Sequence, residues 1–219
     1  MLTFALAMEY AVSIEKEKIN EMPLAEYSDR PIYVVDTMSQ VNAAVAHLRK
    51  HALVGFDTET RPSFKRGEHH KLALIQLATP SACFLFRISK LKSIPLKLKE
   101  YMEDERCVKV GLSTHDDISQ MQRVNKMQPA RFIEIQQLVK QYRITDLSLQ
   151  KIYAILFGQK ISKSQRLTNW EADALTPSQQ RYAAIDAWAC IDIYNRLISG
   201  QFIPEQSPYY HAIEDEQES

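Results

Sequence analysis

The sequence lacks the features that mark secreted and membrane-spanning proteins. Its three cysteines, Cys83, Cys107 and Cys190, form no C-x-x-C pair, which argues against a disulfide framework or a zinc site. Its apolar runs are far shorter than a membrane span, and the mildly apolar stretch 1–12 has no basic start, unlike a signal peptide. We therefore predict a cytoplasmic protein that does not enter a membrane.

An excess of charge is absent as well, because 27 basic residues balance 27 acidic ones. Proteins that coat nucleic acid are usually basic overall, since their affinity comes largely from neutralising phosphates. The balance excludes a uniformly basic surface and leaves room for a local basic patch. A hydrophobic content of 45% and a charged content of 25% are typical of a globular domain, and 219 residues suffice for one substantial core.

Two acidic residues follow the apolar run 53–56. Asp57 and Glu59 are two positions apart, so a strand would direct both carboxylates to the same face. Such like charges repel each other unless a cation lies between them, and hard divalent cations prefer carboxylate oxygens. The pair therefore indicates a metal site, although many surface strands also end in Asp and Glu.

A second acidic pair follows the strand expected at 108–112. Asp116 and Asp117 fall in the first turn of a helix whose buried stripe contains Ile118 and Met121. Acidic residues are common in a first turn because the helix dipole favours them. Either aspartate alone is thus explained by helix stability.

The third pattern begins a long helix. Thr176, Pro177 and Gln179 have the spacing of a capping box with proline at the first helical position, and the helix is expected to end near Gly200. Tyr182 and Asp186 are four residues apart and share one face. Both need polar partners if they are buried.

Together these segments resemble the three exonuclease motifs of the DEDD superfamily, in the branch with a tyrosine in the third motif. The stretch 71–78 is similar to the strand after the first motif in Werner-type exonuclease domains, and 148–158 with 164–170 is similar to that family's approach to the third motif. Ribonuclease D domains share the same motifs. The resemblance extends over about residues 30–200, in the family's order.

The resemblance implies hydrolysis of phosphodiester bonds from the 3′ end of a nucleic acid, with release of nucleoside monophosphates. Two Mg²⁺ or Mn²⁺ ions are implied as cofactors. Asp57 would bridge both ions, Glu59 and Asp186 would complete one site, Asp117 would hold the other ion, and Tyr182 would orient the attacking water. The family's spacing selects Asp117 rather than Asp116, which would be a helper or an exposed capping charge.

Basic residues flank the first and third motifs and are candidates for nucleic-acid binding. We expect a role in phosphate contact for Lys65, Arg66, Lys71, Lys163 and Arg166, although each alone is also explained as part of a solvated loop.

The order of expected elements predicts an α/β fold with a mixed sheet flanked by helices. The resemblance sharpens this to a ribonuclease-H-like fold with five strands. We expect an N-terminal arm at 1–28, the exonuclease domain at 29–203, and an acidic tail at 204–219 that is disordered.

Three functions stay open at this point: an active 3′–5′ exonuclease, which we favour, a catalytically silent module that binds nucleic acid, and an interaction protein with incidental acidic residues. The expected partner is a single-stranded or 3′-recessed nucleic acid. The sequence does not select DNA or RNA, because that choice depends on contacts to the 2′ position, and it leaves the oligomeric state open.

Overall fold

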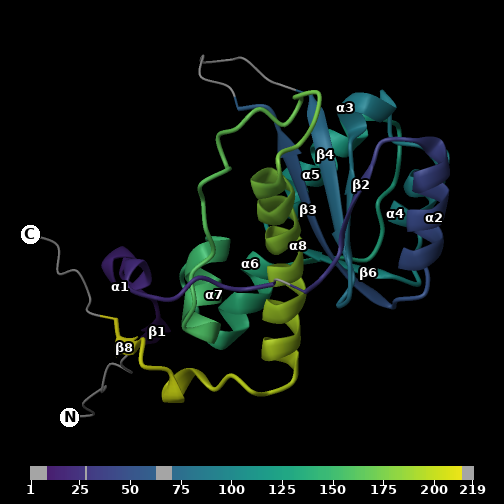
Figure 1. The fold of residues 1–219 in the computed structure, drawn as a ribbon. Helices are drawn as coiled ribbons and strands as arrows, with labels where there is room; N and C mark the ends of the chain where they lie inside the picture. Colours follow the sequence, from purple (N-terminus) through teal and green to yellow (C-terminus); the bar gives the residue numbers. More distant parts are fainter. Residues whose placement is uncertain (1–8, 28, 63–70, 214–219) are drawn as a thin grey trace, which may run out of the picture.

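A six-stranded mixed β-sheet forms the centre of the structure (Figure 1). The computed structural model describes residues 9–27, 29–62 and 71–213. The strands of the sheet are Ile32–Val35 (β2), Leu53–Thr60 (β3), Leu72–Ala78 (β4), Cys83–Phe86 (β5), Val108–Gly111 (β6) and Phe132–Glu134 (β7). Their order is β2-β5-β4-β3-β6-β7. Strand β4 is antiparallel to both of its neighbours, and the other pairs are parallel.

The mixed sheet confirms the predicted α/β architecture, but the prediction of five strands is wrong. The sixth strand is β7, which pairs in parallel with β6. Its three residues are all half-buried, so they show no alternation of buried and exposed positions that a sequence pattern could reveal. The strand forms because its backbone hydrogen-bonds to the edge of β6, a tertiary contact that the local sequence does not reveal.

Helices cover both faces of the sheet (Figure 1). They are Met38–Leu48 (α2), Ile88–Leu91 (α3), Leu96–Met102 (α4), Thr114–Val124 (α5), Ile135–Leu138 (α6), Leu149–Phe157 (α7) and Pro177–Ile198 (α8), with a 3-10 turn at Val139–Tyr142 (η1). Helix α8 packs on one face through its alanines and Trp188. Helices α2, α4 and α5 pack on the other face, around Phe56 and Phe86. No described helix combines the length and apolar character needed to cross a bilayer.

The long helix α8 begins as the sequence predicts. The Thr176 side chain accepts a hydrogen bond from the Gln179 backbone, the Gln179 side chain accepts one from the Thr176 backbone, and Pro177 occupies the first helical position. This capping box confirms the predicted start and satisfies two donors that a bare helix end would leave unpaired. Buried Gln179 also donates to the Thr168 hydroxyl and to the Asn169 carbonyl, so the start of α8 is fixed to the preceding loop.

The segments at the two ends of the described chain form a small second sheet. Tyr10–Val12 (β1) pairs in antiparallel fashion with Tyr210–Ala212 (β8), and a short helix, Lys16–Asn20 (α1), follows β1. Val12, Ile14 and Ile19 are buried in a core cluster shared with α7 and α8. The N-terminal segment therefore packs against the main body through apolar side chains.

The described residues differ from the expected boundaries at both ends. The described part of the arm expected at 1–28 contains β1 and α1, and its residues Val12, Ile14 and Ile19 belong to the core. The tail expected to be disordered from 204 instead forms a 3-10 turn at Pro204–Gln206 (η2) and then β8. Strand pairing with β1 gives this part of the chain its order, and the sequence offered no sign of that distant partner. Residues 214–219 lie outside the described residues, so disorder there stays a prediction.

Candidate active site

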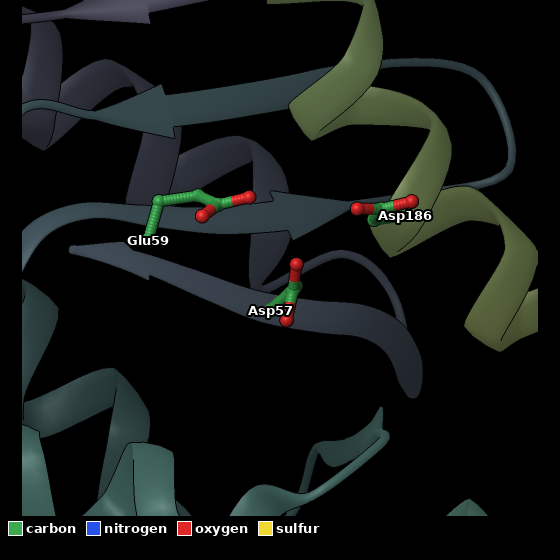
Figure 2. Close-up of side chains that lie close together, drawn as sticks. All are labelled: Asp57, Glu59 and Asp186. Carbon is green, nitrogen blue, oxygen red and sulfur yellow. The ribbon is translucent and has the colours of Figure 1, made fainter. Parts of the chain in front are cut away.

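Three carboxylates meet where β3 passes α8 (Figure 2). The alternation of β3 points Asp57 and Glu59 toward α8, and α8 contributes Asp186. One ligand oxygen from each of the three side chains lies within 4.8 Å of the others. Asp57 and Glu59 keep part of their surface open to solvent, whereas Asp186 is only 7% exposed. The structure thus brings together three of the four carboxylates that the sequence singled out.

Close contact between β3 and α8 sets the position of this cluster. A Cβ atom at Gly55 would lie 1.8 Å from the Ala187 carbonyl oxygen, far inside any real contact distance. Gly55 is two residues before Asp57 on the same face of β3, and Ala187 follows Asp186. A residue without a side chain is therefore needed for the helix to bring Asp186 to the strand. The sequence analysis missed this glycine, whose role depends on the helix that packs over it.

Asp117, and not Asp116, is the buried member of the second acidic pair. Asp117 is 8% exposed, and its carboxylate accepts a hydrogen bond from the hydroxyl of Thr58, the residue between Asp57 and Glu59 in the sequence of β3. The Asp116 side chain is 84% exposed and lies 3.6 Å from His115 Nδ1. Asp117 lies outside the cluster of three carboxylates but lines the same cleft. Asp116 lines the cleft as well, so burial and the bond from Thr58 are what distinguish Asp117, and its role as a metal ligand stays a prediction.

A further acid, Glu134 at the end of β7, supports the turn before Asp117. The Glu134 carboxylate accepts hydrogen bonds from the Ser113 backbone at 3.0 Å, the Thr114 backbone at 2.6 Å and the Thr114 hydroxyl at 2.9 Å. Ser113 has a left-handed backbone with φ of 60°, so its own side chain does not cap α5, and Glu134 caps the helix instead. The sequence analysis missed Glu134 because it missed β7.

Burial raises the pKa of Asp57, Glu59, Asp117 and Asp186, and nearby carboxylates add to the rise for the first three. Burial, followed by the charges of Asp186 and Asp117, raises the pKa of Glu59 to about 9, and the same causes hold the pKa of Asp57 well above its ordinary value. Burial raises the pKa of Asp117 and of Asp186 to about 7. The chain alone therefore does not stabilise four ionised carboxylates here. A site made only of such oxygen donors fits Mg²⁺ or Mn²⁺.

Tyr182 completes the group on α8. Its hydroxyl lies near the Asp186 carboxylate, one turn further along the helix, and this polar neighbour opposes the rise in the pKa of Asp186 that burial causes. Burial, followed by the charges of Asp186 and Glu59, raises the pKa of Tyr182 above its ordinary value. The phenol is therefore protonated at neutral pH and acts as a hydrogen-bond donor.

A cleft of about 460 Å³ contains all five of these side chains. We use "the cleft" for this cavity, which lies between β3, α5, α7 and α8. Lys163 and Arg166 line it, and their contact with phosphate stays a prediction. Lys71 lies just before β4 and outside the lining of the cleft. Lys65 and Arg66 lie outside the described residues, so their role stays a prediction.

Comparison with known proteins gives a consistent result. A model of the 3′–5′ exonuclease family matches residues 32–199. The chain is similar to the bifunctional 3′–5′ exonuclease/ATP-dependent helicase WRN of Mus musculus, with 32% identity over 150 residues, 66% of this chain and 11% of that protein. It is also similar to exonuclease 3′–5′ domain-containing protein 2 of Drosophila melanogaster, with 30% identity over 160 residues, 72% of this chain and 27% of that protein. The chain thus spans a minor part of these relatives' length.

Solved structures share the fold. The Nibbler EXO domain of Aedes aegypti superposes with a TM-score of 0.70 at 22% identity, covering 84% of this chain and 96% of that domain. Ribonuclease D of Escherichia coli superposes with a TM-score of 0.68 at 23% identity, covering 76% of this chain and 44% of that protein. These likenesses confirm the predicted ribonuclease-H-like fold.

Proposed function

This chain belongs to the 3′–5′ exonuclease family, and from that premise we propose that it hydrolyses phosphodiester bonds of nucleic acid from the 3′ end, releasing nucleoside 5′-monophosphates. The observation that carries the proposal is the convergence of Asp57, Glu59 and Asp186 within 4.8 Å, with Asp117 in the same cleft. Burial raises the pKa values of all four carboxylates, and such perturbed groups gathered in a cleft are typical of functional sites.

The four carboxylates are suited to hold two Mg²⁺ or Mn²⁺ ions. Asp57, Glu59 and Asp186 would hold one ion, and Asp57 with Asp117 would hold the second. When bound, such a pair of ions activates the attacking water and neutralises the leaving 3′ oxygen of an in-line displacement. The donor set supports this assignment, because hard divalent ions take oxygen ligands and four carboxylates supply enough negative charge for two of them.

Other side chains of the cleft position the reacting groups. Tyr182 is protonated and lies beside Asp186, so its hydroxyl would donate a hydrogen bond to the attacking water and fix the direction of attack. Lys163 and Arg166 lie near enough to influence the pKa values of Asp186 and Glu59, respectively. They would bind the phosphate oxygens that approach the carboxylates.

The substrate is a single-stranded or 3′-recessed nucleic acid. DNA and RNA are both candidates: the name of WRN gives an exonuclease and a helicase without the type of nucleic acid, and one solved structure of similar fold is a ribonuclease D of Trypanosoma brucei in complex with RNA U12. The alternative, a catalytically silent binding module, is not favoured, because the four carboxylates and Tyr182 line one cleft.

A single assay tests the proposal. Single-stranded DNA, 3′-recessed duplex DNA and single-stranded RNA, each labelled at either end, are incubated with the protein in magnesium, manganese or EDTA. We expect metal-dependent shortening from the 3′ end, and we expect Asp57→Ala to lower the rate about 10³-fold or more while circular dichroism shows an unchanged fold. Absence of cleavage in both metals, or cleavage by Asp57→Ala at the wild-type rate, would refute the proposed function.

A further inference from the structure

The cleft accounts for the end of a substrate strand but not for the rest of it. A volume of about 460 Å³ is in the range that encloses one drug-sized ligand. Nucleotides upstream of the 3′ terminus must therefore lie outside the cleft. Their phosphates are attracted to whichever rim is basic, because phosphate neutralisation dominates affinity for nucleic acid.

Basic side chains lie along one side of the cleft, and the N-terminal segment packs next to them, against α7 and Lys160. Lys163 and Arg166 line the cleft itself. After burial, the causes that lower the pKa of Lys163 include the positive charges of Arg166, Lys16 and Lys151. We call these four residues the basic ridge. Two of its members line the cleft, Lys151 lies on α7, and Lys16 begins helix α1, which packs against α7.

Hydrogen bonds fix α1 in this position. At its start, Asp146 accepts a bond from the Ile14 backbone at 2.8 Å and contacts Lys151 Nζ at 2.7 Å, so the chain entering α1 lies beside Lys151. At its end, Lys160 Nζ donates to the Asn20 carbonyl at 2.5 Å. Lys160 immediately precedes the loop that carries Lys163. Helix α1 is therefore held against both α7 and that loop.

The charge on Lys16 is available to a ligand. Lys16 is exposed, and no acidic group among the described residues lies within ion-pair distance of Lys16, Lys163 or Arg166, whereas Lys151 is paired with Asp146. Lys16 also precedes the part of the chain that matches the exonuclease family, which begins at residue 32. The N-terminal segment thus adds a cation to the rim that the family domain does not itself provide.

We infer that Lys16, together with the exposed end of the basic ridge, binds a backbone phosphate of the nucleic-acid strand upstream of its 3′-terminal nucleotide. The inference rests on the proposed function, since it places the same substrate. It assigns the N-terminal segment a role in holding the strand, in addition to its packing in the core.

The test compares two lysines of the same helix. Lys16→Gln removes the cation of the ridge, and Lys18→Gln is the matched control, because Lys18 lies two positions away and its Nζ is 6.0 Å from the centre of the Tyr209 ring. Each variant is assayed on a single-stranded 12-nucleotide substrate and on the p-nitrophenyl ester of thymidine 5′-monophosphate, which has no upstream phosphate.

We expect Lys16→Gln to lower kcat/KM on the oligonucleotide about threefold and to reduce the slope of log kcat/KM against log salt by about 0.7, the value for one phosphate contact on a single strand. Hydrolysis of the ester should not change, and Lys18→Gln should match the wild type on both substrates. Equal effects of the two variants on the oligonucleotide would overturn the inference, as would an equal loss on the ester.

A binding measurement separates this inference from the proposed function. Fluorescence anisotropy with the labelled oligonucleotide, in calcium, reports affinity without cleavage. If the wild type cleaves neither substrate, the proposed function fails, yet weaker binding by Lys16→Gln than by Lys18→Gln still supports the strand contact. Equal affinities of the two variants would overturn the contact.

Discussion

Buried charge is treated in opposite ways at two places in this fold. Lys109 is fully buried at the start of β6, yet its Nζ donates to the Asp104 carbonyl at 2.7 Å and to the Ala130 carbonyl at 3.2 Å, and it lies over the rings of Tyr101 and Phe132. Asp57 and Glu59 of the cleft have pKa values raised first by burial and then by the charges of the neighbouring carboxylates.

The charge of Lys109 has a structural role, whereas the carboxylates of the cleft require a bound ligand for their charges to be balanced. Around Lys109 the chain supplies the acceptors itself, so the ammonium group is satisfied without any added partner. In the cleft, each additional carboxylate makes the next one harder to ionise. Keeping ionised carboxylates this close together destabilises the fold unless a cation is bound. The cleft, and not the surroundings of Lys109, is therefore the place where we expect an external cation.

The largest expected effect comes from removing one of the crowded carboxylates. We expect Asp186→Asn to lower cleavage about 10³-fold, because it removes a ligand of the cluster. Without metal, however, the variant should be more stable than the wild type near neutral pH, since it relieves repulsion. Thermal unfolding in EDTA and in excess magnesium measures both states. If magnesium left the wild-type melting temperature unchanged, the carboxylates of the cleft would not need an external cation, and the contrast with Lys109 would be wrong.

The pH dependence of the same experiment has a definite sign. The folded protein without metal has raised pKa values of about 7 for Asp117 and Asp186 and about 9 for Glu59, so it retains protons that the unfolded chain releases. Stability from these groups is complete below about pH 4, the ordinary carboxyl range, and is lost as the pH rises through 7 to 9. Asp186→Asn should reduce this loss, and magnesium should oppose it.

Removing the ammonium group of Lys109, whose hydrogen bonds are made within the protein, should change the stability of the fold but not its activity. We expect Lys109→Ala to destabilise the fold by about 2–4 kcal/mol, because it leaves a cavity and deprives two buried carbonyls of a donor. The loss should be the same with and without magnesium, and cleavage per folded molecule should not change. Urea unfolding provides the measurement, with Lys109→Met as the control that keeps most of the volume. A shift in magnesium dependence would show that Lys109 belongs to the site after all.

A smaller effect is expected from the acid that supports Asp117 indirectly. Glu134→Gln keeps the size of the side chain but removes the charge that caps α5, so Asp117 should be held less precisely. We expect the magnesium concentration for half-maximal activity to rise about tenfold, with little change in the rate at saturating metal. Exposed Asp116 provides the matched control, and Asp116→Asn should leave the magnesium dependence unchanged. The reverse ranking of the two variants would assign the metal to Asp116.

The sequence predicted the parts of the site that follow from local spacing. Asp57 and Glu59 were found from strand alternation, and Tyr182 and Asp186 from the period of a helix with a recognisable cap. Selecting Asp117 over its neighbour required the family's spacing.

The parts that were missed depend on contacts between distant segments. Gly55 matters only because Ala187 lies over it, and Glu134 because β7 adds to the edge of the sheet. Lys16 matters because Asp146 and Lys160 hold α1 against α7 and the loop that carries Lys163. Each of these residues is unremarkable in its own stretch of sequence. A pattern read along the chain contains no information about the partner that gives such a residue its role.

The contact between Gly55 and the Ala187 carbonyl has a consequence for engineering. Since main-chain atoms touch there, the spacing between Asp57 and Asp186 is set by backbone and not by the size of any replaceable side chain. Substitutions that change the volume of core side chains elsewhere should therefore leave the distance between the two carboxylates unchanged. A designer who transplants these carboxylates into another scaffold would have to copy the bare position beneath the helix along with the acids themselves.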